Sequence, residues 1–418
     1  MNSAKWWLAG PPAATVLAVV LLAAPAAAQD GATREAELGA TQGRVEAMGE
    51  QVAALQSDVD RRKKFKFSGY VQARYEVNES SKDDVTTTSS SSVTPANTNR
   101  LYIRRGRIKL TYDSSPLSQG VVYLDAGEDR AVTLLEAYVT LRDPWTTNHR
   151  HALTVGQMNI PFGYEIERSS SVRELPERSR AENILFRGER DRGAILTSQW
   201  LPRLQTVVGL LNGPGIRHAD FPNSAPRQGK DLVGRIRWTQ GVFDVATSIY
   251  SGENVIPLAD SSYTRDRHVT HDKSRFGADA QFYYQLPHLG GGSLKGEFYV
   301  GHEVNPDSVR TLAPGRVLRG GKDPEHLATD FSGWYVMWVQ NIQERFQVAA
   351  RYDVYDPNTD VDRDRYERIG GALHYFYDAN VRLTAAYDAP TTERFRRSNA
   401  TWYDPQDNVW TIQFQHKF

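Results

Sequence analysis

The stretch Phe65–Val77, which reads FKFSGYVQARYEV, decides the fold of this chain. Its odd-numbered residues are apolar or small, whereas its even-numbered residues are mostly polar, as at Gln72 and Glu76. Successive side chains of an extended strand point to opposite faces, so a period of two indicates a β-strand. The stretch therefore predicts one long strand with an apolar face and a polar face.

The same alternation returns many times along the chain. It is clear at 134–142, 275–286, 345–354, 381–388 and 409–418. In Arg100–Tyr112 the phase slips between Ile103 and Ile108, which predicts a β-bulge near Arg105-Gly106. These strands are about 10–13 residues long, as tilted membrane-crossing strands are, whereas strands of soluble proteins average about 5–6 residues.

Connectors between the predicted strands alternate between short and long. Short ones carry turn residues, as in Asp113-Ser114-Ser115-Pro116, and long ones are polar, as in 78–99, 161–191 and 304–330. Short turns at one end and long loops at the other are typical of outer-membrane barrels. A soluble β-sandwich also alternates, but its core would not accept the many charges on the polar faces. We therefore predict an all-β fold, an antiparallel transmembrane β-barrel of about sixteen strands over residues 65–418.

The composition agrees with a barrel once its two faces are considered separately. The 418 residues include 50 Lys and Arg, 50 Asp and Glu and no Cys, with a mean hydropathy of -0.54. The balanced charge argues against a nucleic-acid binder, and the absence of Cys excludes disulfides and thiolate metal sites. Repeated apolar runs of about 20 residues are missing, which argues against a bundle of membrane helices. A low mean hydropathy is expected when half of each strand faces water.

The N-terminus predicts export. Lys5 precedes an apolar run at 13–24 and small residues up to Ala28, so residues 1–28 are expected to be a signal peptide cleaved after Ala28. A single membrane anchor is the alternative. Residues 29–64 then carry a heptad pattern, which predicts a short periplasmic coiled-coil helix that self-associates. Its a and d positions are Leu38, Val45, Met48, Val52, Leu55 and Val59. Gly39, Gly43 and Gly49 leave a lone amphipathic helix or a linker open.

Several blocks resemble the phosphate-selective porin O and P family. They are Arg100–Arg107, Leu135–Val139, Val155–Gly163 with Glu165, Ser169-Ser170, Glu177-Arg178-Ser179, Arg192-Gly193, Asn212-Gly213 and Lys230–Arg235. Val155–Gly163 is the most distinctive, and the resemblance spans residues 65–418. It implies a sixteen-stranded homotrimeric porin of the cell outer membrane that passes anions, with one long loop folded into the barrel.

The loop that would narrow the barrel, 161–191, is rich in arginine. Six arginines lie in this loop and a seventh, Arg192, directly follows it. The six are Arg168, Arg173, Arg178, Arg180, Arg187 and Arg190. Five acids share the stretch: Glu174, Glu177, Glu182, Glu189 and Asp191. Arginine keeps its charge and binds oxyanions through a planar fork, and rings of Arg or Lys select anions in pores. The other interpretation is that these arginines pair with nearby acids and hold the loop to the wall, and both can apply.

The strands add further inward-facing candidates. Foremost are Arg104, Arg235 and Arg237, and the others are Arg74, Arg275, Arg345, Arg351 and Arg382. Glu76, Glu136, Asp279 and Asp353 are expected on the same faces. The lumen is therefore expected to be mixed in charge. The loop from Asp356 to Glu367 has acids at EF-hand spacing, but Val361 stands where the turn needs Gly, so we expect a solvated loop tip and no metal site.

The expected function is diffusion of small hydrophilic solutes, favouring anions such as phosphate, through an arginine-rich constriction. No HExxH, GxSxG or GxxxxGK motif is present, so we expect neither an enzyme nor a cofactor. The expected partners are small anionic solutes, outer-membrane lipid and two further copies of the chain. The alternative is a structural barrel that tethers the outer membrane to the cell wall.

Overall fold

The computed structural model describes residues 64–81, 85–89, 92–95, 97–128, 131–217, 225–257, 268–304, 328–362, 364–392 and 407–418, with Met48 and Gln51 in addition. The predicted signal peptide and nearly all of the predicted coiled coil lie outside these residues. Within the described part of the chain, no helix is long and apolar enough to cross a membrane.

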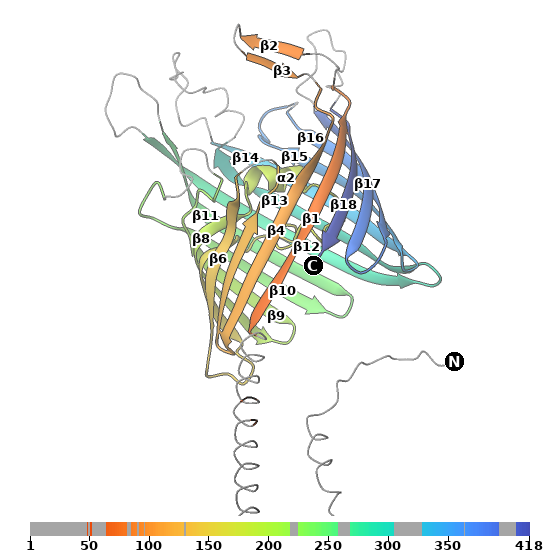
Figure 1. The fold of residues 1–418 in the computed structure, drawn as a ribbon. Coiled ribbons are helices and arrows are strands. Elements are labelled where there is room, and N and C mark those ends of the chain that lie inside the picture. Colours follow the sequence, from red (N-terminus) through yellow and green to blue (C-terminus); the bar gives the residue numbers. More distant parts are fainter. Residues whose placement is uncertain are drawn as a thin grey trace, which may run out of the picture. The chain divides into compact units, whose positions relative to one another are not determined.

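Sixteen strands form a closed antiparallel barrel, in which β1 pairs with both β4 and β18 (Figure 1). The predicted fold class and strand number are confirmed. The barrel strands are β1 (Phe65–Asn78), β4 (Arg100–Ser115), β5 (Ser118–Asp125), β6 (Thr133–Arg142), β7 (His151–Asn159), β8 (Arg190–Leu201), β9 (Leu204–Leu211), β10 (Asp231–Gln240), β11 (Phe243–Pro257), β12 (His268–Leu286), β13 (Gly290–Val304), β14 (Ala328–Ile342), β15 (Phe346–Asp356), β16 (Tyr366–Phe376), β17 (Val381–Thr392) and β18 (Val409–Lys417). A small hairpin, β2 (Val85–Ser89) and β3 (Ser92–Pro95), lies in the first long connector.

The predicted β-bulge is present where β1 pairs with β4. Gln72 lies opposite Arg105, and the next residue, Ala73, lies opposite Ile103, so Arg104 is the extra residue. A bulge lets two successive side chains escape strict alternation. The bulge therefore resets the inward face of β4, which matters for the pore.

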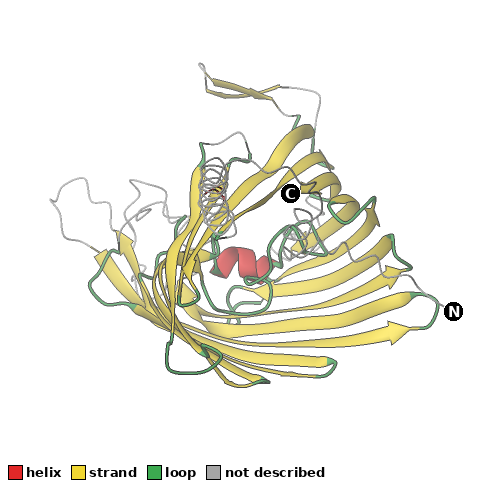
Figure 2. Ribbon diagram, turned by 60° about the horizontal axis from the view of Figure 1, so that its bottom comes forward, coloured by secondary structure: helices red, strands yellow, loops and turns green. Residues whose placement is uncertain are grey.

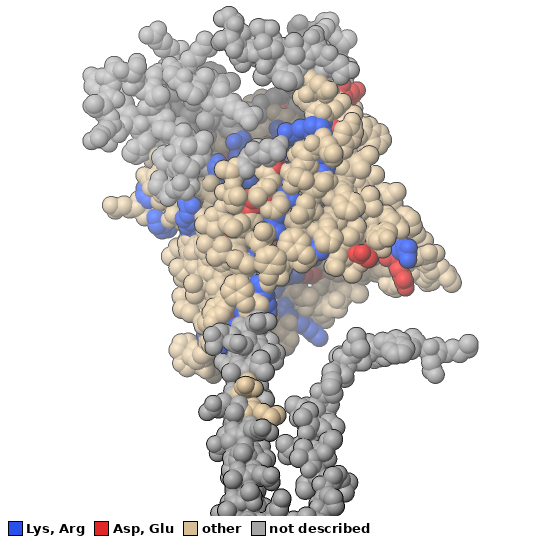
Figure 3. Space-filling model, viewed as in Figure 1, with Lys and Arg blue, Asp and Glu red and all other residues tan. Residues whose placement is uncertain are grey.

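Alternation along each strand separates a lipid-facing surface from a polar lumen. On β18, Ile412 and Phe414 are 57% and 48% exposed. Gln413, between them, and Gln415, the next residue along the strand, are buried inside the barrel. The face of the barrel in Figure 3 is predominantly uncharged. Because such an apolar band is stable only when lipid covers it, the barrel belongs in an outer membrane.

The connectors follow the predicted two-ended arrangement. Short turns at 116–117, 202–203 and 241–242 lie at one end, and most long connectors lie at the other. Two details differ from the prediction. Arg345 is exposed in the turn 343–345 rather than inward on a strand, and the connector 126–132 is short although it lies at the long-loop end. At the loop tip, the carboxylate of Asp356 accepts the backbone N–H of Asn358, so it serves the turn.

Residues 160–189, here called the constriction loop, lie inside the barrel. The loop carries one short helix, α2 (Arg180–Leu185), which Figure 2 shows within the ring of strands. Phe162, Ile166 and Leu185 are buried against Tyr299 and Phe331 of the wall. Leu175 lies in a second apolar cluster with Tyr335, Met337 and Ala349. Apolar burial of this size holds the loop against β11–β16, which leaves the lumen open beside β4–β9.

Candidate functional site: an arginine-lined passage

Two cavities lie between the constriction loop and the wall formed by β4–β9. The outer cavity, toward the long connectors, has a volume of about 620 Å³, and its wall includes Arg104, Arg105 and the connector residue Glu128. The inner cavity, toward the short turns, has a volume of about 640 Å³, and its wall includes Tyr138 and Thr140 of β6. Both are large enough for small hydrophilic solutes.

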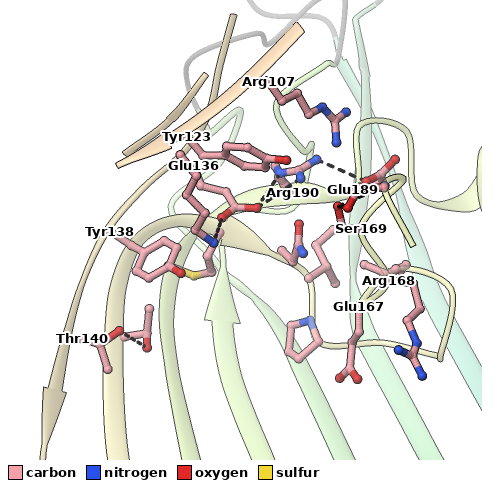
Figure 4. Close-up of a pocket in the computed structure, with 18 of the residues that line it drawn as sticks. Arg107, Tyr123, Glu136, Tyr138, Thr140, Glu167, Arg168, Ser169, Glu189 and Arg190 are labelled. Carbon is pink, nitrogen blue, oxygen red and sulfur yellow. Dashed lines mark hydrogen bonds and ion pairs between the residues drawn. The ribbon is translucent and has the colours of Figure 1, made fainter. Parts of the chain in front are cut away.

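The two cavities share three lining residues, Arg107, Glu189 and Arg190, which are here called the neck. Figure 4 shows these residues at the top of the inner cavity, with Arg190 between Glu136 and Glu189. Arg190 donates from Nε and Nη2 to Oε1 of Glu136, at 3.2 and 3.1 Å, and from Nη1 to Glu189 at 3.2 Å. A solute that moves between the cavities therefore passes two arginines whose positions are fixed by hydrogen bonds.

Arg107 is held from three sides. Its Nε donates to Asp125 at 2.8 Å, and its Nη1 donates to the Tyr70 hydroxyl at 3.0 Å and to Ser170 of the constriction loop at 3.4 Å. Its guanidinium also lies 5.7 Å from the centre of the Tyr123 ring. Fixed donors bind an anion better than free ones because less side-chain entropy is lost on binding.

Positive side chains outnumber negative ones in both cavities. In the outer cavity, seven arginines (104, 105, 107, 173, 187, 190 and 217) face four acids (125, 128, 177 and 189), an excess of three. In the inner cavity, Arg107, Lys109, Arg168, Arg190 and Lys417 face Glu136, Glu167 and Glu189, an excess of two. A low-dielectric wall focuses this field into the passage.

Glu177 is the point at which the constriction loop joins the β1–β4 wall. Its carboxylate accepts Arg74 Nη1 at 2.7 Å and Arg104 at 3.1 and 3.2 Å, and Arg105 lies 3.8 Å away. Burial alone raises the pKa of Glu177, but Arg104, Arg74 and Arg105 outweigh it and hold the pKa well below its usual range. Glu177 is therefore ionised at neutral pH and neutralises part of this arginine group.

Arg173 differs from its neighbours because its donors are not used. It lines the outer cavity and is only 5% exposed, yet Nε and Nη2 have no hydrogen-bond partner among the described residues. Burial lowers its pKa, and the nearby carboxylates of Glu177 and Glu165 oppose that effect. Arginine remains charged despite such shifts. Both nitrogens are almost fully enclosed by neighbouring atoms, so an oxyanion in the cavity would reach them only after a local rearrangement of Arg173.

Two loop arginines fit the structural interpretation instead. Arg178 is buried and lies outside the lining of both cavities, where it donates to the backbone carbonyls of Glu165, Ile166 and Arg168. It also forms ion pairs with Glu182 and Glu189. Burial lowers the pKa of Arg178 to about 10. Arg180 stacks on the ring of Tyr366 at 4.6 Å and also lies outside both linings. Arg178 in particular holds the loop in shape.

The two nominated arginines of β10 are paired with acids. Arg235 is buried and donates to both oxygens of Asp279, at 2.6 and 3.2 Å. Arg237 donates to Asp244, with Nε at 2.9 Å from Oδ1. Both also lie near Glu167, at 3.4 and 3.7 Å, and neither lines the outer or the inner cavity. Their charges are therefore balanced locally.

The remaining candidates divide between the two cavities and the wall. Arg187 is exposed in the outer cavity, and Arg168 lines the inner cavity with its guanidinium 4.7 Å from the Tyr164 ring. Arg192 lies on β8 outside both linings. Of the ten nominated arginines, the structure thus brings Arg104, Arg168, Arg173, Arg187 and Arg190 together around the passage.

Sequence reasoning missed Arg105, Arg107, Lys109 and Lys417, which line the passage. The signal for the first three was present, because the phase slip in β4 marks the bulge at Arg104. After that extra residue the odd-numbered side chains face inward, so Arg104 and Arg105 reach the lumen together. Lys417 follows from the alternation of β18, where odd-numbered residues point inward.

The fold is shared with known outer-membrane channels. No protein-family model matches the chain, and no curated protein matches its sequence. The outer-membrane channel DcaP of Acinetobacter baumannii is similar, with a TM-score of 0.55 and 13% identity over 85% of this chain and 97% of that one. The anion-selective porin of Comamonas acidovorans has a TM-score of 0.54 and 10% identity over 85% of this chain and 99% of that one. OprB of Pseudomonas putida has a TM-score of 0.53 and 8% identity over 85% of this chain and 95% of that one.

At these identities the likeness concerns the fold alone. It supports the porin fold that the sequence resemblance implied, while membership of the phosphate-selective O and P family stays a prediction. The sixteen strands, the apolar outer face and the loop inside the barrel agree with that likeness. The chain therefore has the fold of the outer-membrane porins.

Proposed function

We propose that this protein is an outer-membrane diffusion porin through which small anions, phosphate among them, pass along the arginine-lined passage. The observation that carries the proposal is the neck, where Arg107 and Arg190 line both of two cavities that each have an excess of positive side chains. An anion would enter the outer cavity, pass the neck, and leave past Lys109 and Lys417 toward the short turns.

Electrostatics supports passage of anions rather than tight binding. Four of the eight cavity arginines, Arg104, Arg105, Arg107 and Arg190, pair with acids such as Glu177 and Glu136, so the positive charge is partly neutralised. A solute that finds a moderate excess of positive charge is attracted yet can leave again, as conduction requires. A lumen lined by unpaired arginines alone would retain oxyanions.

Arg173 is the strongest contact that we propose for a passing oxyanion. Its Nε and Nη2 form the planar fork that matches two oxygens of phosphate or carboxylate. Arg173 lines the outer cavity, ahead of the neck, although Nε and Nη2 themselves are enclosed. The selectivity therefore depends on this residue together with Arg107 and Arg190.

We further propose a homotrimer with a periplasmic coiled coil at 29–64 and outer-membrane lipid around the barrel. The apolar outer faces of β1 and β18, with Val71, Tyr75, Ile412 and Phe414, provide surface for lipid or for a neighbouring copy. The signal peptide at 1–28 supplies the export that this location requires.

The test is the effect of phosphate on single-channel chloride current in planar bilayers. Phosphate is expected to reduce the chloride current of the native channel. Arg173→Gln is expected to raise the half-inhibiting concentration about tenfold or more, since a charge-assisted contact contributes about 1.5–3 kcal/mol. The matched control is Arg180→Gln, which removes a loop arginine outside both cavities and is expected to leave the inhibition unchanged. Equal inhibition in both variants would contradict the role of Arg173, and absence of conductance steps would favour a structural tether.

A further inference from the structure

Three buried carboxyl groups meet where the constriction loop lies against β13. Glu165 and Glu182 belong to the loop and Glu297 to β13, and they are 3%, 1% and 4% exposed. One carboxylate oxygen of each residue lies within 4.8 Å of one oxygen of each of the other two. Three negative charges at this separation in a buried site would repel strongly, so the cluster needs neutralising groups.

Two of the three carboxylates are well supplied with donors. Glu165 accepts Arg351 Nη1 at 2.8 Å and the backbone N–H of Ser179 at 2.8 Å. Glu297 accepts the Tyr299 hydroxyl at 2.7 Å and the backbone N–H groups of Tyr164 and Glu165. Glu165 is therefore suited to remain ionised in place.

Glu182 is the exception in the cluster. Neither of its carboxyl oxygens has a hydrogen-bond donor among the described residues. Its ion-pair partner, Arg178 at 3.0 Å, also binds Glu189 and three backbone carbonyls. A buried carboxylate in this position is costly, whereas a carboxylic acid brings its own donor.

We propose that Glu182 holds a proton that it donates to Glu165, and that this acid–carboxylate pair latches the constriction loop to the barrel wall until Glu182 ionises. The latch would regulate the same passage and thus rests on the proposed porin function. When it opens, the loop can move only into the cavities on its other side, so its release interrupts the current.

The charge distribution agrees with a single proton in this pair. Burial raises the pKa of Glu182 well above its usual range, and the neighbouring Glu165 and Glu297 raise it further although Arg178 opposes them. Glu165 behaves in the opposite way: burial raises its pKa, but Arg351 and the hydrogen bonds from Glu182 and Ser179 bring it below the usual value. Glu182 is thus suited to donate a hydrogen bond as a carboxylic acid, and Glu165 is suited to accept it as a carboxylate.

The groups that face the cluster come from four elements. They are Arg173 and Arg178 on the loop, Glu297 and Tyr299 on β13, Tyr335 on β14, and Arg351 and Asp353 on β15. The oxygen spacing could also span a divalent cation, but Arg351 and Arg178 already lie at 2.8 and 3.0 Å from two of the carboxylates. A proton satisfies the geometry without placing a cation beside two guanidinium groups.

The sign of the pH effect follows from linkage. In an undocked loop the pKa of Glu182 returns to about 4.3, so docking takes up a proton at any pH between that value and the raised pKa of the docked state. The contribution of Glu182 to docking is therefore largest below about pH 4.3. Above that pH the equilibrium constant for docking falls by up to about tenfold per pH unit. It becomes constant again once the pH exceeds the pKa of Glu182 in the docked loop.

The direct test measures how often the loop leaves the wall. Ala181 is 2% exposed and faces Gly333 of β14, whereas Val172 on the same loop is 44% exposed. The chain has no cysteine, so Ala181→Cys and Val172→Cys each introduce one thiol. Each thiol reacts with a neutral thiol reagent, and the rate for Ala181→Cys is divided by the rate for Val172→Cys. Taking this ratio corrects for ionisation of the thiol itself. The ratio is expected to rise at least tenfold between pH 6 and pH 9.

Glu182→Gln separates the latch from other pH effects, because its amide also donates to Glu165 but cannot ionise. In this background the rate ratio is expected to stay flat and low, and channel closures at pH 9 should disappear. The matched control, Glu344→Gln in the exposed turn 343–345, should keep the native pH response.

A rise that persists in Glu182→Gln, or a flat ratio in the native background, would overturn the latch. A response to EDTA at constant pH would also overturn it, in favour of a cation. The migration of unheated samples in SDS gels checks that each variant folds. Anion selectivity measured in the same bilayers tests the proposed porin function separately, since a pH-insensitive but anion-selective channel would contradict only the latch.

Discussion

Arg351 of β15 donates from Nη1 to Oε1 of Glu165 in the constriction loop at 2.8 Å, although 186 residues separate them. Both side chains are almost fully buried. This ion pair joins the loop to the wall next to the apolar cluster around Phe162 and Tyr299. The passage therefore owes its shape to polar contacts as well as to apolar packing.

Replacing one partner of this pair should release the loop. Arg351→Met leaves Glu165 buried beside Glu182 and Glu297 without its main cation, which is expected to weaken loop docking by about 3–5 kcal/mol. Hydrogen exchange of residues 160–189 measures the change. The double variant Arg351→Met with Glu165→Met should recover much of the protection, because no charge is left unpaired. Exchange that is equally fast in the single and double variants would contradict this account.

A second prediction concerns Gly163, at the start of the constriction loop. Its φ is 65°, and a Cβ there would lie 2.6 Å from Oε1 of Glu297. Gly163→Ala is therefore expected to weaken loop docking by about 1–3 kcal/mol through backbone strain and displacement of Glu297. Gly120, where a Cβ meets nothing within 4 Å, is the matched control. Faster proteolysis of the loop in Gly163→Ala but not in Gly120→Ala is the expected result, and equal proteolysis would count against it.

The neck offers a test of how selectivity is set. Glu189 is the acid that lines both cavities, next to Arg107 and Arg190. Removing one unit charge about 8 Å from the path, at an effective dielectric constant of about 40, changes the energy of a passing anion by about 1 kcal/mol. Because the energy of a passing cation changes by the same amount with the opposite sign, Glu189→Gln should raise the anion-to-cation permeability ratio about thirtyfold, and Glu344→Gln in the exposed turn 343–345 should not. An unchanged ratio in Glu189→Gln would mean that the neck does not control permeation.

The predicted coiled coil can be tested by deletion. Removing residues 29–62 is expected to leave the barrel folded but to make the trimer dissociate at lower detergent concentration or temperature, because the heptad contacts between copies are lost. Size-exclusion chromatography with light scattering measures the oligomeric state. Trimers of unchanged stability would show that this segment is dispensable for assembly.

The fold could be predicted because membrane barrels leave a simple pattern in sequence. Each strand has one face in lipid and one in water, so the period of two in Phe65–Val77 is repeated around the barrel. Even the β-bulge at Arg104 appeared as a slip in phase. These features depend on neighbouring residues in the chain, which is why the sequence alone is informative.

The passage was harder to predict because it depends on contacts far apart in sequence. Tyr335, Met337 and Val339 make an apolar inward face on β14, where alternation suggests water, and it is the constriction loop that covers them. The position of the loop then decides which arginines remain in the lumen. Arg235 was nominated but is paired with Asp279, whereas Arg107 was missed and stands in the neck.

The central claim, that the passage favours anions, is tested most directly by the reversal potential of the native channel in planar bilayers under a potassium chloride gradient. The outer cavity has an excess of three positive side chains and the inner one an excess of two. We therefore expect a reversal potential whose sign shows that chloride permeates more readily than potassium. The selectivity should shrink from 0.1 M to 1 M salt, as the Debye length falls from about 10 to about 3 Å. A potential of the opposite sign, which means preferred passage of potassium, would contradict the account.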